Sequence, residues 1–238
     1  MEIALVVLLG FILGSFFNVC IHRIPEGKSV IHPPSYCPKC LKAIKWYDNI
    51  PVLGYFLLKG KCRYCNEGIS FRYPLIEIAT GIIFLLIFLK FGLEKSYFFY
   101  IMIMGYMIIL TVIDIDKKVV PDSIILFMFI TGFIAGLFEL KDFNNIFEGI
   151  AGALAGGFVM LVLSFFSNSK LGEGDVKLIA ALGLWLGFID VMNLILYAFI
   201  IGGIWAFVLI ALKKSGPKDE IAFVPFIGAA YVVLVLIK

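Results

Sequence analysis

The chain has 238 residues, of which 62% are hydrophobic and 16% are charged. So few polar residues cannot cover a soluble domain of this length. The composition therefore excludes an ordinary soluble protein and indicates a polytopic membrane protein. The formal net charge of +3 says little by itself, because it averages over an uneven distribution of lysines and arginines.

The first apolar segment covers residues 1–21 and is about long enough to cross a bilayer, which takes about 20 residues. It has neither a basic n-region nor an A-x-A site, which indicates a first transmembrane helix and not a removed signal peptide. Seven further candidates follow, at residues 73–91, 97–114, 122–138, 146–166, 176–192, 194–212 and 221–237. We therefore predict an all-α polytopic membrane protein with about eight transmembrane helices.

The basic residues predict the orientation of these helices. On an eight-helix topology, sixteen of the 20 lysines and arginines fall on one side of the membrane. Loops rich in lysine and arginine stay in the cytoplasm. Both termini are therefore expected outside. The polar segment 22–71 and the loops near Asp114 and Asp175 are expected on the cytoplasmic side.

Residues 22–71 form a polar insertion between the first two predicted helices, too short to build a core without a metal or disulfides. Two C-x-x-C pairs lie in it, Cys37 with Cys40 and Cys62 with Cys65, separated by 21 residues. This separation is slightly beyond the usual range for zinc sites. Each pair presents two thiolates from one turn, and two such turns complete a tetrahedron around Zn²⁺.

Two alternatives compete with zinc at these cysteines. Disulfides are disfavoured in the reducing cytoplasm, and a redox site needs only one C-x-x-C pair. Four thiolates close the coordination sphere, so we expect a structural zinc ion and not a catalytic one. The fifth cysteine, Cys20, lies at a helix end and is interpreted as a small apolar filler.

Two groups of carboxylates lie next to apolar segments. Asp114 directly follows one apolar run, whereas Asp175, in the stretch GEGDVKL, opens another. A carboxylate at a helix N-terminus is also explained by capping alone, because the helix dipole favours it. The remaining acids near helix ends are interpreted as solvated loop residues; they are Glu139, Asp142, Glu148 and Asp190.

A pair of aspartates from two membrane helices suggests aspartic proteolysis. Two neighbouring carboxyls share one proton, so that one acts as a base on water and the other as an acid toward the scissile carbonyl. Gly172 and Gly174 would allow a sharp turn and a close approach to a partner. The spacing of Asp114 and Asp175 in the sequence does not decide whether their side chains meet. Lys177 either extends to the membrane–water interface or shifts the pKa of a neighbouring group.

Several segments together resemble the type IV prepilin peptidases, membrane aspartic proteases that process prepilins and pseudopilins. The matching segments occur in the order found in the family: GSFFNVCIHRIP at 14–25, the two C-x-x-C pairs, YDNIPVLGY at 47–55, YPLIEIATG at 73–81, IDIDKKVVPD at 113–122 and GEGDVKL at 172–178.

The resemblance implies roles for these residues. Asp114 corresponds to the first catalytic aspartate and Asp175 to the second, while Asp116 and Asp122 compete locally for the first role. The cysteines Cys37, Cys40, Cys62 and Cys65 would hold the structural zinc. Glu77 is interpreted as a structural or substrate-positioning acid.

The resemblance also implies a substrate and a second activity. The substrate would be a prepilin or pseudopilin with a short basic leader, cut at the cytoplasmic face of the bacterial cytoplasmic membrane. Many members also methylate the new N-terminus with S-adenosylmethionine, an activity associated with the insertion. No glycine-rich fingerprint occurs, so no residue is assigned to this methyl donor. The expected partners are the lipid bilayer and the prepilin or pseudopilin substrate. We expect no nucleic acid among them.

These implications divide the chain into three predicted parts: a first transmembrane helix at 1–21, a methyltransferase-associated zinc insertion at 22–71 and a membrane peptidase domain at 72–238. Two other classes of protein compete with a protease. A transporter would more often carry acids near the bilayer midplane and show inverted repeats. A zinc-containing assembly scaffold would leave the G-E-G-D pattern unexplained. A zinc protease is excluded more firmly, because no H-E-x-x-H occurs.

Overall fold

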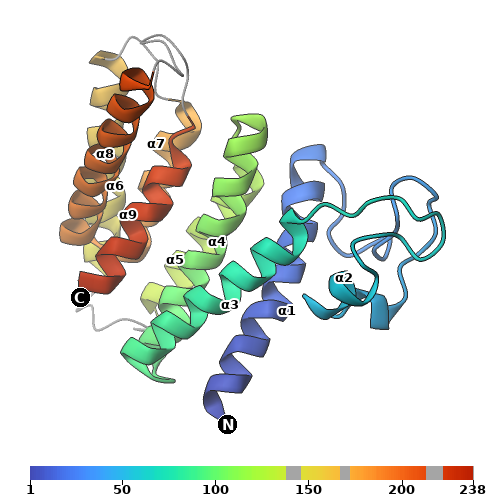
Figure 1. The fold of residues 1–238 in the computed structure, drawn as a ribbon. Coiled ribbons are helices and arrows are strands. Elements are labelled where there is room, and N and C mark those ends of the chain that lie inside the picture. The colour runs from blue at the N-terminus through green and yellow to red at the C-terminus, as the bar shows by residue number, and fades with distance from the viewer. Residues whose placement is uncertain (138–145, 167–171, 213–221, 238) are drawn as a thin grey trace. The chain divides into compact units, whose positions relative to one another are not determined.

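The computed structural model describes residues 1–137, 146–166, 172–212 and 222–237. Within these ranges it contains no strand, and the predicted all-α class is confirmed. Eight helices in the described part of the chain have 14 residues or more: α1 (Glu2–Arg23), α3 (Arg72–Phe91), α4 (Lys95–Lys117), α5 (Asp122–Leu137), α6 (Ile146–Phe166), α7 (Glu173–Leu186), α8 (Phe188–Ala211) and α9 (Val224–Ile237) (Figure 1). The insertion adds a short α2 (Leu53–Leu57) and two 3-10 turns, η1 (Ile24–Glu26) and η2 (Trp46–Asn49).

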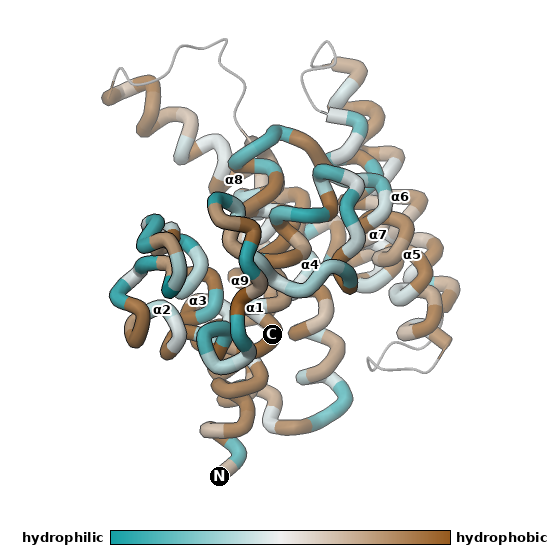
Figure 2. The backbone as a smooth tube through the Cα atoms, turned by 90° about the vertical axis from the view of Figure 1, so that its right-hand side faces the viewer, coloured by the Kyte–Doolittle hydropathy of each residue, from teal (hydrophilic) through white to brown (hydrophobic). Residues whose placement is uncertain are grey.

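Five helices in the described ranges are long and apolar enough to cross a membrane, namely α1, α3, α4, α6 and α8. The apolar helices α5 and α9 are shorter. Large apolar side chains such as Leu154, Phe158 and Leu161 lie exposed along one face of α6, which suits contact with lipid. Figure 2 colours the backbone by hydropathy and shows hydrophobic residues along the long helices. The chain is thus a multi-pass membrane protein, while the count of eight spans stays a prediction.

The predicted boundary between the spans 176–192 and 194–212 is wrong. The helices instead break at Gly187, whose φ of 82° belongs to a region that favours glycine. Asp190 therefore lies in the first turn of α8 and is 7% exposed, so its interpretation as a solvated loop residue is also wrong. Glu148 is exposed as expected, whereas Glu139 and Asp142 fall outside the described residues.

The chain divides into two compact units, Met1–Leu93 and Glu94–Lys238. In the first unit, α1 packs against α3 along glycines. A Cβ atom added to Gly10 would lie 2.6 Å from the Cα of Gly81, and one added to Gly14 would lie 2.7 Å from the Cα of Glu77. The two backbones therefore touch, and the insertion leaves the membrane helices from this tightly packed pair.

In the second unit, α7 packs against α5, α6 and α8, and α9 packs against α4 and α8. The small-residue stretch 151–158 of α6 packs closely against α7: a Cβ atom on Gly152 would lie 2.5 Å from the carbonyl oxygen of Gly183. This packing brings the start of α7 beside the end of α4, where the candidate carboxylates lie. The three-part division into 1–21, 22–71 and 72–238 concerns function and stays a prediction.

Candidate active site and metal centre

Asp114 and Asp175 come together in the second unit. Asp114 lies in the last turns of α4 and is 6% exposed, and Asp175 lies half-buried in the first turn of α7. The two carboxylates are close enough for the charge of Asp114 to act on Asp175. The competing residues Asp116 and Asp122 are both exposed. Of the three candidates for the first role, Asp114 is thus the one that is buried beside Asp175.

Asp175 precedes the predicted span 176–192 and lies outside the five candidate spans. Burial raises the pKa of Asp175 to about 6, and the negative charge of Asp114 acts in the same direction. Two neighbouring carboxyls in such surroundings do not both ionise readily. The pair can therefore hold one shared proton near neutral pH.

The first turn of α9 holds Asp114. The backbone N–H of Val224 donates to Oδ2 of Asp114 over 3.0 Å, and the N–H of Phe223 also donates to this carboxylate. N–H groups in the first turn of a helix have no partner within the helix, and the helix dipole favours an anion there. Sequence reasoning missed this contact. Pro225 does signal a helix start, but not which side chain that start would face.

Gly174 explains part of the G-E-G-D pattern. A Cβ atom at this position would lie 2.7 Å from the Cβ of Val120, in the loop between α4 and α5. At Gly172 the nearest atom would be an oxygen of Asp175, at 3.6 Å, which is ordinary contact. Gly174 therefore lets the first turn of α7, and Asp175 with it, lie directly against the chain that follows Asp114.

Lys177 pairs with Asp122, the Nζ and Oδ1 atoms being 2.8 Å apart. Both side chains are exposed, so the pair contributes little to stability. It nevertheless joins the start of α7 to the start of α5 on the side of the carboxylates. Asp122 thus forms an ion pair with Lys177 and is not buried beside Asp114 and Asp175, and Glu173 lies exposed at the start of α7.

The four cysteines of the insertion come together from two turns with the same backbone pattern. The N–H of Cys37 donates to the carbonyl of Lys42, and the N–H of Leu41 donates back to Cys37. Cys62 makes the equivalent pair of bonds with Glu67 and Asn66. Each turn is closed by one antiparallel bridge, between Tyr36 and Ala43 and between Lys61 and Gly68.

The sulfur positions suit a tetrahedral metal ion. The Sγ atoms of Cys37 and Cys65 are 3.8 Å apart and those of Cys40 and Cys62 are 4.0 Å apart. All four lie within 4.8 Å of one another. Zinc bound to thiolates at about 2.3 Å in a tetrahedron requires sulfur atoms about 3.8 Å apart. None of these cysteines forms a disulfide, so the cluster can bind a metal.

The segment YDNIPVLGY at 47–55 joins this cluster to the membrane helices. Asp48 accepts two hydrogen bonds from Arg63 of the second C-x-x-C turn, from Nε at 2.8 Å and from the terminal nitrogen at 2.5 Å. The guanidinium holds the pKa of Asp48 below its usual value. Four residues on, the N–H of Val52 donates to Oε2 of Glu77 in α3 over 2.6 Å. Glu77 is 7% exposed, and this contact supports the predicted structural role.

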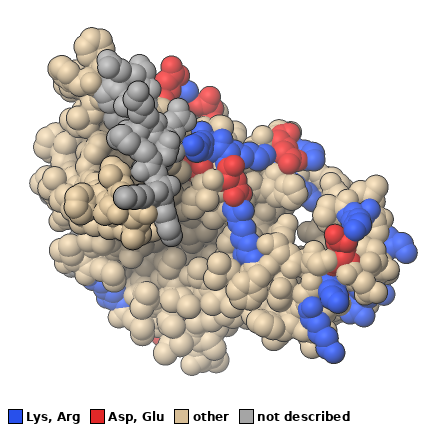
Figure 3. Space-filling view, turned by 45° about the horizontal axis from the view of Figure 1, so that its top comes forward, with Lys and Arg blue, Asp and Glu red and all other residues tan. Residues whose placement is uncertain are grey.

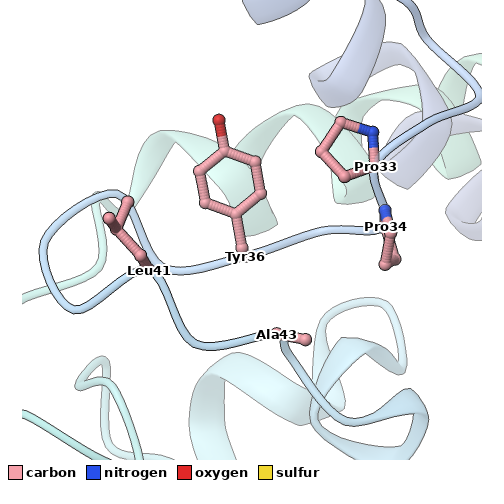
Figure 4. Close-up of a pocket in the computed structure, with 5 residues that line it drawn as sticks. All are labelled: Pro33, Pro34, Tyr36, Leu41 and Ala43. Atoms are coloured by element: carbon pink, nitrogen blue, oxygen red, sulfur yellow. The ribbon is translucent and has the colours of Figure 1, made fainter.

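A pocket of about 340 Å³ lies beside the first cysteine turn (Figure 4). Pro33, Pro34, Tyr36, Leu41 and Ala43 line it, and the Tyr36 ring stands next to the two prolines. These residues offer ring and van der Waals contacts but no charged group. Apart from the Tyr36 hydroxyl, these lining residues carry no acid–base side chain.

Matches to two protein families together cover most of the chain. The bacterial peptidase A24 N-terminal domain matches residues 8–91, and the type IV leader peptidase family matches residues 101–207. The first match contains the cysteine turns, and the second contains Asp114 and Asp175.

Individual relatives agree with these matches. A prepilin leader peptidase/N-methyltransferase of Klebsiella pneumoniae is 40% identical over 190 residues, which is 75% of this chain and 82% of that protein. Proteins of the same name are 34% identical in Neisseria gonorrhoeae, over 89% of this chain and 83% of theirs, and 29% identical in Bacillus subtilis, over 98% and 94%. No solved structure matches this chain. The chain therefore belongs to the type IV leader peptidase family.

Proposed function

We propose that this protein is a membrane aspartic endopeptidase that removes the leader from type IV prepilins or pseudopilins and then methylates the new N-terminus. The observation that carries the proposal is the buried Asp114 beside Asp175, in a chain related to proteins named prepilin leader peptidase/N-methyltransferase. The reaction would take place at the cytoplasmic face of the bacterial cytoplasmic membrane, the side to which the lysines and arginines assign both carboxylates.

The surroundings of the two carboxyls favour different roles. The N–H donors at the start of α9 stabilise the ionised form of Asp114, since hydrogen bonds to a carboxylate favour its charge. Among the described residues Asp175 receives one such backbone contact, from Gly172, and burial raises its pKa to about 6, so that it can carry the shared proton. We therefore assign Asp114 as the base and Asp175 as the acid.

The hydrolysis of the peptide bond then proceeds in two steps. Asp114 takes a proton from a water molecule, whose oxygen attacks the scissile carbonyl carbon while Asp175 gives its proton to the carbonyl oxygen. In the second step Asp114 returns its proton to the amide nitrogen and the C–N bond breaks. Asp175 then recovers a proton from the former carbonyl oxygen, which restores the starting pair.

Methyl transfer would follow on the freed N-terminal amine, with S-adenosylmethionine supplying the methyl group. We associate this activity with the insertion at 22–71, as the family resemblance implies. The pocket beside Tyr36 presents no charged lining group for the sulfonium or amino-acid part of such a donor, so we assign it no part in methyl transfer.

We also propose that the four-cysteine cluster binds one structural zinc ion. Its sulfur separations support this choice, and four thiolates leave no open coordination position for a substrate. The bound ion would hold the two cysteine turns together. The Arg63–Asp48 pair and the Val52–Glu77 hydrogen bond would then fix the position of the cysteine turns relative to α3.

The aspartate assignment is tested by single substitutions. Asp114→Asn and Asp175→Asn should each lower prepilin cleavage at least about 100-fold, because each removes a general acid or base. Asp116→Asn and Asp122→Asn serve as exposed controls and should cleave normally. Cleavage is followed by gel mobility, and methylation by the mass of the mature N-terminus. Near-normal cleavage by the variants at 114 and 175 would show that the proposed mechanism is wrong.

The contribution of α9 is tested at Val224. Val224→Pro removes the N–H that donates to Asp114, at the first helical position, where proline is tolerated. Val224→Ala keeps the N–H and serves as the matched control. We expect the proline variant to lose roughly 10-fold in kcat relative to the alanine variant, since a hydrogen bond to a charged group contributes about 1.5–3 kcal/mol. KM should change little. Equal kcat values in two variants of equal thermal stability would contradict this role.

The close approach at Gly174 is tested against Gly172. Gly174→Ala adds a Cβ that collides with Val120 and should displace Asp175, lowering cleavage at least about 10-fold, because small displacements of catalytic groups are costly. Gly172→Ala has room for its Cβ and should stay within about twofold of the unsubstituted protein. A Gly174→Ala protein as active as Gly172→Ala would show that this contact does not position Asp175.

The metal is tested by elemental analysis of the purified, reduced protein. We expect about one zinc ion per chain, lost in Cys62→Ser and kept in Cys20→Ala, since Cys20 lies in α1 and not in the cluster. Limited proteolysis should cut the insertion faster in the zinc-free variant, because its two turns lose their common ligand. A reduced, intact protein without zinc would overturn the assignment.

A further inference from the structure

The short helix α2 exposes an apolar face. Leu53, Phe56 and Leu57 are spaced i, i+3 and i+4 and therefore lie on the same side of the helix, and they are 58%, 57% and 75% exposed. The helix is fixed in place beside this face, because a Cβ atom at the buried Gly54 would lie 2.2 Å from the carbonyl oxygen of Asp48. The apolar face thus cannot turn inward without breaking this contact.

The depth of α2 follows from its contact with α3. The N–H of Val52, the residue before α2, donates to Glu77, which is the sixth residue of α3. At 1.5 Å per residue, Glu77 lies about 7–8 Å along the helix from its first residue. Helix α3 is a candidate span that begins at Arg72. Helix α2 therefore begins beside the second turn of a candidate membrane helix. With the first residue of α3 taken as the membrane surface, this position falls within the depth of about 5–10 Å to which interfacial helices bury their apolar face.

The charges next to α2 suit an anionic surface. The three acids of the insertion between residues 24 and 71 are paired with bases of the same segment: Glu26 with Lys28, Glu67 with Lys39 and Asp48 with Arg63. Lys59 and Lys61 directly follow α2 and are exposed, and no acid within the described residues forms an ion pair with either. Figure 3 shows lysine and arginine side chains gathered on this part of the molecule.

We propose that α2 is a membrane-interface anchor for the insertion. Leu53, Phe56 and Leu57 enter the boundary between headgroups and acyl chains of the leaflet at which α3 begins, and Lys59 and Lys61 bind anionic phospholipid headgroups. A basic partner, such as a positively charged peptide, would be repelled by these lysines. The anchor would hold the cysteine turns against the bilayer surface.

The depth of α2 is measured by fluorescence quenching in the full-length, zinc-loaded protein in nanodiscs. Phe56→Trp is placed in a background in which Trp46, Trp185 and Trp205, the three native tryptophans, are replaced by phenylalanine. Tyr64→Trp in the same background reports on the second cysteine turn. We expect dibromo-lipids to quench the tryptophan at position 56 at least twofold more than the one at 64, and acrylamide to show the opposite order.

Two results would overturn the anchor. One is strong acrylamide quenching at position 56 without quenching by bromolipids, which would mean that the face is in water. The other is protection from both quenchers, which would mean that protein covers the face. If Phe56→Trp does not fold, Leu57→Trp makes the same measurement on the same face.

The charge component is tested with lipid composition. In nanodiscs rich in phosphatidylglycerol, Lys59→Gln combined with Lys61→Gln should reduce bromolipid quenching at position 56, whereas in phosphatidylcholine it should change nothing. Equal quenching in the two lipids with both lysines present would show that anionic headgroups are not bound. Prepilin cleavage by Asp114 and Asp175 is measured separately, so a failure of the anchor leaves the proposed protease intact.

Discussion

The hydrogen bond from the Val224 N–H to Asp114 is the contact on which the candidate active site depends. A carboxylate buried at the end of a membrane helix is costly unless donors satisfy it. Backbone N–H groups of Phe223 and Val224, at the start of α9, supply these donors. Asp114 is therefore held in one orientation, whereas among the described residues Asp175 has one backbone hydrogen-bond partner, Gly172.

The glycines around the site help to position the second carboxylate, Asp175. Helix α7 carries Asp175 at its start, so the position of this carboxylate depends on how closely α7 packs on its neighbours. Gly174 allows contact with Val120, and Gly183 allows contact with Gly152 of α6. In a membrane, where apolar burial does not drive helices together, such close backbone packing is a main source of attraction. The packing that stabilises the second unit therefore also positions Asp175.

The structure of the insertion likewise depends on a series of specific contacts. Two short turns with identical hydrogen bonds bring four sulfurs together, Arg63 and Asp48 join the second turn to η2, and Val52 joins the insertion to Glu77. A segment of this size has too small an apolar core to specify one structure. A metal at the sulfurs and a lipid surface beneath α2 would each replace part of that missing core.

Local patterns in the sequence determined the helices, the two cysteine turns and the set of candidate carboxylates, because each pattern reports on neighbouring residues. The boundary between α7 and α8 was placed at residue 193 instead of at Gly187, since an apolar run continues across this glycine. The tertiary structure alone decided that Asp114, and not Asp116 or Asp122, is buried beside Asp175. It also supplied the partner of Asp114, which lies 110 residues away in the chain. Contacts at such separations depend on how the helices pack, and no local spacing encodes them.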